Sequence, residues 1–276
     1  MPNRVNVLGV AVSAVNLPSA LAVVAEAVRT RRKGYICVTG VHGVMEAQSD
    51  PGFRRILNEA LLCTPDGMPM VWVGWWQGQR DMRRVYGPDL MLDVCAWSEK
   101  NSCRHFFFGG AEGVAGLLAS RLQARFPGLQ TVGTFAPPFR PLTDEEAKAF
   151  AEQVQAARPD ILWVGLSTPK QEKFMAEYLP KLDVPLMIGV GAAFDFFSGR
   201  VRQAPRWMQR SGLEWLYRLC QEPRRLAGRY LRNNPRFAVK ILGQLCGLKK
   251  YPLGDGKGED GTDLTSNNQH PTSNIQ

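Results

Sequence analysis

The sequence lacks several patterns that would assign a function directly. Its six cysteines form no C-x-x-C pair, and no complete G-x-G-x-x-G fingerprint follows any apolar run. The cysteine spacing disfavours a zinc site or a disulfide framework and is typical of small buried hydrophobic residues in a reducing compartment. The incomplete glycine fingerprint argues against a standard dinucleotide site.

Long hydrophobic runs are also absent. The most apolar window, residues 185–197, contains Asp195 and is shorter than the roughly 20 residues that a membrane-spanning helix needs. The N-terminus has no basic segment followed by an apolar run and a cleavage site, so we expect no signal peptide. Any contact with a membrane should therefore be peripheral.

Positive charge is concentrated near the C-terminus. Residues 198–250 hold thirteen Lys and Arg and two Glu, a formal charge of +11, whereas the whole chain of 276 residues carries +9. This shift predicts an α/β core over residues 1–197 and a basic, amphipathic helical extension over 198–252. Residues 253–276 have almost nothing to bury and are expected to form a disordered tail.

Short apolar runs alternate with Ala-rich amphipathic stretches along the core. The runs cover residues 5–10, 35–39, 105–108, 131–135, 161–166 and 186–190. The alternation predicts a Rossmann-like, mostly parallel sheet with helices on both faces. Two capping boxes are indicated, Thr143 with Glu146 and Thr168 with Gln171, and Pro169 suits the first helical position.

Polar residues that follow the apolar runs are the candidate ligand-binding groups, because ligands bind at the carboxyl ends of parallel strands. Asp66 either acts as a general base or caps the next helix. His42 lies between glycines and is either close to a ligand or a structural loop residue. Gly109 and Gly110 either cradle a phosphate or form a tight turn.

Two further polar residues have alternative explanations. The capping-box spacing would give Gln171 a backbone partner without any ligand. Asp195 interrupts an apolar stretch, so its carboxylate needs either a ligand hydroxyl or a backbone amide to offset its desolvation.

The extension combines arginines with bulky apolar side chains. Arg218, Arg225 and Arg229 have helical spacing, although Pro223 should break or kink the helix between the first and the second. The arginines either converge on one anion or are simply solvated. Trp and Leu side chains among them are typical of a helix at an anionic bilayer surface.

Taken together and in order, these blocks resemble the WecG/TagA/CpsF glycosyltransferases, glycosyltransferase family 26. The resemblance covers about residues 5–237 and rests on the following segments: Thr39, 64–67 (TPDG), 86–91 (YGPDLM), 108–110 (FGG), 168–172 (TPKQE), 189–195 (GVGAAFD), 204–207 (APRW) and 212–219 (GLEWLYRL).

The resemblance implies an enzyme that transfers a sugar, with inversion, from a UDP-sugar to a polyprenyl-diphosphate-linked saccharide. It implies a peripheral position at the cytoplasmic membrane face and a role in exopolysaccharide or cell-surface polysaccharide synthesis. It implies Asp66 as the base with Thr39 beside the reacting centre, and Gln171 and Asp195 as donor-binding residues. Arg218, Arg225 and Arg229 would approach the diphosphates.

Two departures from common patterns refine this expectation. No Asp-x-Asp metal motif occurs, so we expect helix N-termini and arginines to stabilise the leaving group, with no metal and no cofactor. The family often has Asn two residues after the threonine, whereas Val41 and then His42 follow here. His42 is a candidate replacement, and glucose, N-acetylmannosamine and its uronate all remain open as the donor sugar.

Two other functions compete with this interpretation. A nucleotide-dependent oxidoreductase would need the complete glycine fingerprint. A nucleic-acid-binding protein would explain the basic extension, but the bulky aliphatic residues within it and the lack of any recognised motif favour an anionic membrane surface as the partner. A homo-oligomer is compatible with the sequence.

Overall fold

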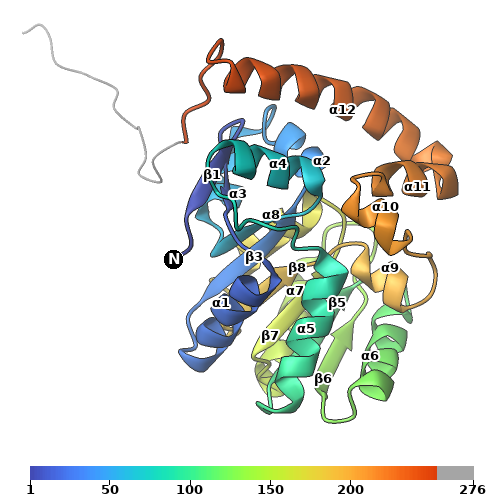
Figure 1. Ribbon diagram of the computed structural model, residues 1–276. Coiled ribbons are helices and arrows are strands. Elements are labelled where there is room, and N and C mark those ends of the chain that lie inside the picture. The colour runs from blue at the N-terminus through green and yellow to red at the C-terminus, as the bar shows by residue number, and fades with distance from the viewer. Residues whose placement is uncertain (254–276) are drawn as a thin grey trace, which may run out of the picture.

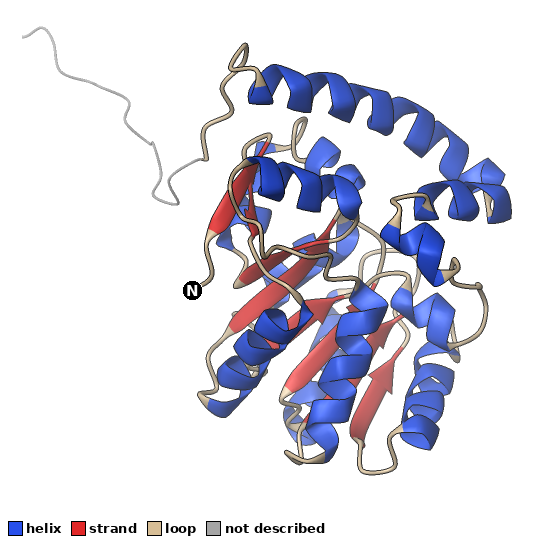
Figure 2. Ribbon diagram, in the orientation of Figure 1, coloured by secondary structure: helices blue, strands red, loops and turns tan. Residues whose placement is uncertain are grey.

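The computed structural model describes residues 1–253, and a six-stranded, all-parallel sheet lies at its centre (Figures 1 and 2). The strand order is β4-β3-β8-β7-β5-β6. The strands are β3 (Gly34–Thr39), β4 (Leu62–Pro65), β5 (Arg104–Gly109), β6 (Gln130–Phe135), β7 (Ile161–Gly165) and β8 (Leu186–Gly189). The predicted Rossmann-like architecture is confirmed.

Helices cover both faces of the sheet because alternate strand residues point to opposite sides. Ile36 and Trp163 pack on one face, whereas Cys37 and Val164 pack on the other. The helices of the core are α1 (Leu17–Arg29), α2 (Val41–Glu46), α3 (Pro51–Glu59), α4 (Met68–Trp76), α5 (Gly87–Glu99), α6 (Val114–Arg125), α7 (Asp144–Ala157), α8 (Lys170–Tyr178) and α9 (Ala193–Phe197). Helices α1, α5, α6 and α9 share the first face, and α3, α7 and α8 the second.

The alternation of apolar runs predicts that residues 5–10 form a strand of the parallel sheet, and this prediction is wrong. Residues 5–10 instead belong to an antiparallel hairpin of β1 (Arg4–Val7) and β2 (Val10–Ser13). The turn at Leu8 and Gly9 has positive φ at both positions, 53° and 83°. Such a turn matches the twist of a hairpin and reverses the chain, which an unbroken strand could not do.

One of the two predicted capping boxes is confirmed. Thr143 accepts a hydrogen bond from the backbone N–H of Glu146, whose side chain accepts from the Thr143 backbone. The prediction for Thr168 is wrong, because α8 begins without a side-chain cap and Thr168 donates to a different side chain. Four cysteines are buried as expected, whereas Cys220 and Cys246 are exposed on the C-terminal helices.

The C-terminal extension forms three helices along the carboxyl edge of the sheet (Figure 1). They are α10 (Arg206–Arg210), α11 (Glu214–Gln221) and α12 (Pro223–Leu245). Pro223 starts α12 after a break in the helix, as predicted. Phe237 and Ile241 anchor α12 in the hydrophobic core. The predicted tail, residues 253–276, lies outside the described residues except for Leu253.

Candidate active site

A cleft of about 180 Å³ lies at the carboxyl edge of the sheet, where four parallel strands end side by side. It is lined by Val38, Asp66, Tyr86, Gly87, Pro88, Leu166, Ser167, Thr168, Gln171, Val190, Gly191, Ala192, Asp195, Arg218, Arg225 and Arg229. Six of the residues predicted from the sequence therefore meet in one place. They come from the loop after β4 and from α8, α9, α11 and α12.

Asp66 is the carboxylate that follows β4. Its backbone N–H donates to the Thr39 carbonyl at 2.9 Å, which fixes the loop against the end of β3. Helix α4 begins at Met68 with Gly67 as its N-cap and with no side-chain hydrogen bond to the cap. The capping alternative for Asp66 is therefore excluded. The side chain is 32% exposed and lines the cleft.

The surroundings of Asp66 favour its neutral form more than water would. Burial raises the pKa of this carboxyl above its ordinary value, Arg84 opposes the shift, and the nearby carboxylate of Glu214 adds to it. A carboxylate with a raised pKa accepts a proton more readily than an ordinary aspartate. The group is thus suited to remove a proton from an incoming hydroxyl.

Arg84 was not predicted from the sequence and forms the closest cationic contact of Asp66. Its Nη2 lies 3.4 Å from Asp66 Oδ1 and makes a shorter ion pair with Glu214 of α11. Its guanidinium also lies over the ring of Tyr86, 4.0 Å from the centroid. Arg84 therefore joins the loop that carries Asp66, the start of α5 and the first turn of α11.

Gln171 and its neighbours form a polar cluster beneath the cleft. The Thr168 hydroxyl and the Gln171 amide both donate to Glu172 Oε1 at 2.9 Å. Gln171 Oε1 is buried and has no partner among residues 1–253. Because Glu172 holds the amide nitrogen, the free oxygen of Gln171 remains as an acceptor at the cleft wall.

Asp195 contributes a second carboxylate from α9. Burial raises the pKa of its carboxyl, and Arg225 and Arg200 oppose that shift. No hydrogen bond within residues 1–253 reaches this side chain. A backbone amide therefore does not offset the cost of burying its charge. Its environment is instead set by the arginines of the extension.

Three arginines of the extension converge on the cleft. Arg218 lies in the last turn of α11, and Arg225 and Arg229 lie in the first turns of α12. Arg225 pairs with Glu222, whereas the buried Nε of Arg218 has no partner within residues 1–253. Burial and the charge of Arg225 lower the pKa of Arg229. A cluster of cations whose charges destabilise one another favours binding of an anion.

Three predicted residues lie just outside the cleft. Thr39 is buried beside Asp66, and its Oγ1 has no partner in the described chain. Gly109 and Gly110 form the turn after β5, where the Gly110 N–H donates to the Gly165 carbonyl at 3.1 Å. A Cβ on Gly109 would lie 2.5 Å from that oxygen. The geometry favours the tight-turn alternative, because the glycine pair allows β5 to end against β7.

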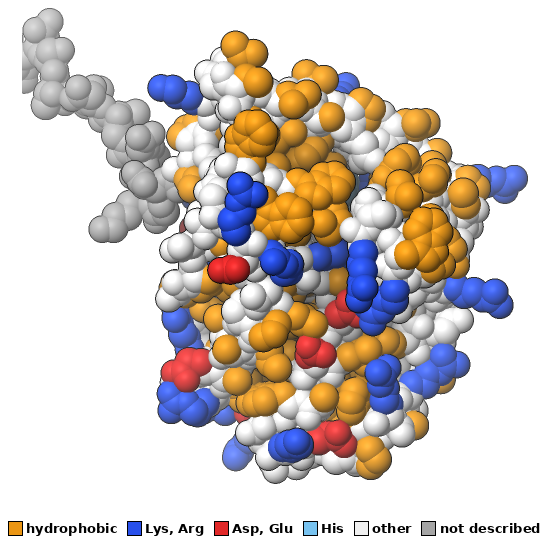
Figure 3. All heavy atoms as spheres, in the orientation of Figure 1, with side chains coloured by type: hydrophobic (Ala, Val, Ile, Leu, Met, Phe, Trp, Pro, Cys, Tyr) orange, Lys and Arg blue, Asp and Glu red, His pale blue; other side chains and the backbone are white. Residues whose placement is uncertain are grey.

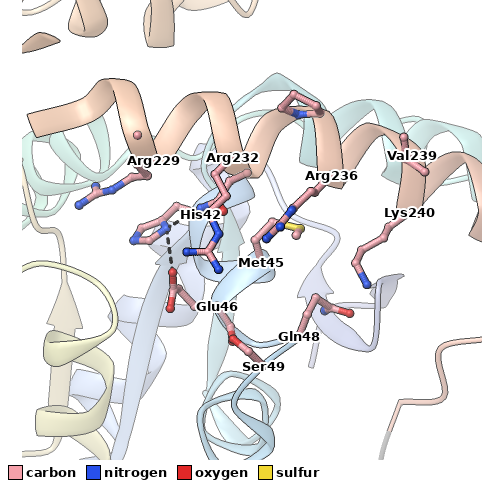
Figure 4. Close-up of a pocket in the computed structure, with 13 residues that line it drawn as sticks. His42, Met45, Glu46, Gln48, Ser49, Arg229, Arg232, Arg236, Val239 and Lys240 are labelled. Carbon is pink, nitrogen blue, oxygen red and sulfur yellow. Dashed lines mark hydrogen bonds and ion pairs between the residues drawn. The ribbon is translucent and has the colours of Figure 1, made fainter. Parts of the chain in front are cut away.

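His42 lies in a separate, larger groove between α2 and α12 (Figure 4). The groove has a volume of about 780 Å³, and Arg229 lines both it and the cleft. His42 Nδ1 is 3.1 Å from Asn233 Nδ2 and 3.5 Å from Glu46 Oε1. Burial lowers the pKa of this imidazole, so the neutral form accepts from Asn233. His42 thus connects α2 to the extension.

Two further features of the described residues concern metal binding and membrane-spanning helices. Within residues 1–253, no three His, Cys, Asp or Glu side chains are grouped so that they could hold a metal ion. Over the same residues, no helix is both long enough and apolar enough to cross a bilayer.

Comparisons with known proteins complete the description of the site. Residues 5–251 match the model of the Glycosyl transferase WecG/TagA/CpsF family. An N-acetylglucosaminyldiphosphoundecaprenol N-acetyl-beta-D-mannosaminyltransferase of Bacillus spizizenii is 30% identical over 77% of this chain and 80% of its own length. The enzyme of the same name from Bacillus subtilis is 29% identical over 71% of this chain and 74% of its own. The chain belongs to the WecG/TagA/CpsF family of glycosyltransferases.

Proposed function

We propose that this protein transfers a sugar from a UDP-sugar to a saccharide carried on a polyprenyl diphosphate, with inversion at the anomeric carbon. The names of the two Bacillus relatives support an acceptor of N-acetylglucosamine linked through diphosphate to a polyprenol. The donor sugar is glucose, N-acetylmannosamine or its uronate. The product serves the synthesis of an exopolysaccharide or a cell-surface polysaccharide.

Asp66 is the proposed general base of this reaction. The acceptor hydroxyl attacks the anomeric carbon of the donor, and its proton passes to the Asp66 carboxylate. The bond between the anomeric carbon and the diphosphate oxygen breaks, and UDP leaves with the electron pair. The raised pKa of Asp66 supports this role, and Thr39 supports it indirectly because its carbonyl holds the Asp66 loop.

The donor is held by both parts of the chain. Gln171 Oε1 and the Asp195 carboxylate are acceptors suited to hydroxyl groups. Arg218, Arg225 and Arg229 bind the diphosphate and stabilise the charge that develops on the leaving group, so that transfer requires no metal. Gly109, Gly110 and His42 act from outside the cleft by shaping the sheet edge and by holding the extension.

A single observation carries this proposal. Asp66 and the three extension arginines lie far apart in the sequence and yet line the same cleft. A base and a set of anion-binding groups in one small cavity are the two components that transfer from a diphosphate-linked sugar requires. The incomplete glycine fingerprint and the closed turn at Gly110 leave the oxidoreductase alternative without a comparable site.

Contact with the cytoplasmic face of the membrane is proposed through exposed apolar side chains near the cleft. They are Trp72 and Trp76 on α4, Trp207 on α10, Trp215 and Leu216 on α11, and Leu231, Val239 and Leu242 on α12. Figure 3 shows hydrophobic side chains gathered over this part of the molecule, with Lys and Arg beside them. Indole rings beside cations favour the interface of an anionic bilayer.

The proposal is tested with a panel of UDP-sugars and a short-chain prenyl-diphosphate-linked N-acetylglucosamine, with the products identified by mass spectrometry in the presence of EDTA. One UDP-sugar should give a disaccharide of inverted anomeric configuration. Asp66→Asn should lower kcat by about 10²–10⁴-fold and leave UDP affinity nearly unchanged. Asp183→Asn, at an exposed carboxylate, is the matched control. Unchanged turnover in Asp66→Asn would remove Asp66 as the base.

A further inference from the structure

A third cavity adjoins Asp66 through Arg84. It has a volume of about 490 Å³ and lies between α4 and α10. Its lining residues are Met68, Val71, Trp75, Arg83, Arg84, Asp89, Arg206, Gln209 and Arg210. None of these residues lines the cleft described above. The ion pair between Asp66 and Arg84 therefore stands between the two cavities.

The α4–α10 cavity has one apolar and one cationic wall. Met68, Val71 and Trp75 of α4 form the apolar wall. On the cationic wall, Arg206 is held by Asp89 at 2.9 and 3.0 Å. Within residues 1–253, by contrast, no carboxylate lies within 4.0 Å of Arg83 or Arg210, so two guanidinium groups keep an uncompensated charge. These walls suit a ligand with an anionic head and an apolar tail.

Two exposed tryptophans are sequence neighbours of residues that line this cavity. Trp207 is 64% exposed beside Arg206, and Trp72 is 49% exposed next to Val71. A Cβ on Gly212 would lie 3.2 Å from the Trp72 ring, which shows that the turn between α10 and α11 packs on α4. Exposed indoles are favoured at the boundary between water and lipid. The cavity thus opens where a lipid-linked substrate would arrive.

In the proposed transfer, the acceptor must reach the anomeric carbon from the side opposite to the leaving UDP. In a displacement with inversion, the attacking oxygen and the leaving oxygen lie on opposite sides of the anomeric carbon. The cleft of about 180 Å³ lies below the roughly 300–1,000 Å³ of sites that enclose one drug-sized ligand, so a bound UDP-sugar extends beyond it and a second diphosphate-linked sugar needs adjoining space.

We propose that the α4–α10 cavity binds the diphosphate and the first prenyl units of the acceptor. Arg210 and Arg83 bind the diphosphate, and Met68 and Trp75, the partly exposed residues of the apolar wall, contact the prenyl chain. The terminal sugar reaches Asp66 past Arg84. The donor diphosphate is bound separately, in the cleft, by Arg218, Arg225 and Arg229. This assignment rests on the proposed transfer reaction and adds to it the path of the acceptor.

The test measures binding of three probes by calorimetry: short-chain prenyl-diphosphate-linked N-acetylglucosamine, farnesyl diphosphate and inorganic diphosphate. Arg210→Gln should weaken the first two about tenfold, the loss of one charge-assisted contact, and leave the affinity for UDP unchanged. Arg210→Lys should restore part of the loss. Arg32→Gln, at an exposed arginine before the amino end of β3, is the matched control.

Failure of the assigned acceptor cavity can be distinguished from failure of the proposed transfer reaction. Unchanged acceptor affinity in Arg210→Gln, or an equal loss of UDP affinity, would overturn the assignment even if the enzyme transfers sugar. Inorganic diphosphate that binds as tightly as farnesyl diphosphate would also overturn it, because the apolar wall would then contribute nothing. Prenyl-diphosphate binding that depends on Arg210 would support the cavity even if no UDP-sugar were a donor.

Discussion

The sheet body and the C-terminal extension contribute to the same cleft but are held in place very differently. Every residue of β3 is buried, whereas α11 has no buried residue and α12 has three in 23 positions. The body is stabilised by two hydrophobic clusters on either side of the sheet. The extension is held mainly by Leu226, Phe237 and Ile241 of α12 and by a few polar contacts.

The two regions therefore have different roles: the body accounts for most of the fold, and the extension completes the cleft. The body supplies Asp66 from the loop after β4, Gln171 from α8 and Asp195 from α9. The extension supplies Arg218, Arg225 and Arg229, and the first turn of α11 is tied to the Asp66 loop through Arg84 and Glu214. Because the extension buries little apolar area, its docking contributes less free energy than folding of the body. Changes in the part of the extension that lines the cleft should therefore affect activity more than global stability.

Removal of the extension should have the largest effect. A chain ending before Met208 lacks all three cleft arginines and the exposed side chains of α11 and α12. Transfer should fall by roughly 10³-fold or more, because no group remains to stabilise the leaving diphosphate. Binding to anionic vesicles should also be lost.

The measurements for the truncation are turnover, vesicle cosedimentation and thermal unfolding by circular dichroism. A cooperative unfolding transition should remain, at a lower midpoint, because Phe237 and Ile241 no longer cover the core. Full activity of the truncated chain would show that the extension plays no part in the site.

Loosening the anchor of α12 should have the next largest effect. Phe237 is buried against the body, so Phe237→Ala should cost about 3 kcal/mol, much of it in docking of the extension. Val239 lies two positions further along and is 72% exposed, so Val239→Ala is the matched control. Hydrogen exchange of α12 and turnover would report the change. Equal exchange rates in the two variants would argue against an anchor at Phe237.

A smaller effect is expected where the end of α12 meets the hairpin. Gln244 accepts from the Leu8 N–H and donates to the Asn6 carbonyl, each at 2.8 Å. Gln244→Ala should cost about 1 kcal/mol in unfolding free energy, because the Leu8 N–H loses its partner and the Asn6 carbonyl keeps only its bond from Gln77. Turnover should change little, since these contacts lie far along α12 from the cleft arginines. Urea denaturation measures the first effect and initial rates the second.

The smallest effects concern the pH dependence of transfer. Activity should fall as pH decreases through the pKa of Asp66, because only the carboxylate accepts a proton. Arg84→Gln removes a cation that opposes the raised pKa, so the acid limb should move to higher pH. Glu214→Gln removes a like charge, so the limb should move to lower pH. Shifts in the same direction for both variants would contradict the assignment of this limb to Asp66.

Much of the fold followed from local patterns, and the exceptions have physical causes. The runs at 35–39 and 161–166 predict buried parallel strands because both sheet faces are covered, and the structure confirms them. The run at 5–10 is equally apolar, yet two positive φ values at Leu8 and Gly9 divide it into a hairpin. Leu8 is not a residue whose identity signals a turn, so this reversal was not predictable from composition.

The site was predictable only in part, because some of its contacts join distant segments. The polar residues after β4 and β8 were found by the rule that ligands bind at strand ends. Arg84 was missed, since it lies in an irregular segment and its carboxylate partners are 18 and 130 residues away. The spacing predicts a capping role for Gln171, but its side-chain amide instead donates a hydrogen bond to the buried carboxylate of Glu172. Tertiary contacts therefore override local hydrogen-bond patterns in both cases.

The most direct test of the account is UDP affinity after a change in the extension alone. Arg218 has a buried, unpartnered Nε within residues 1–253 and lines the cleft, so Arg218→Gln removes a diphosphate contact without breaking an internal ion pair. Calorimetry should show UDP binding weakened about tenfold, with a reduced dependence on salt, while Arg32→Gln binds normally. Unchanged UDP affinity in Arg218→Gln would contradict the claim that the extension completes the donor site.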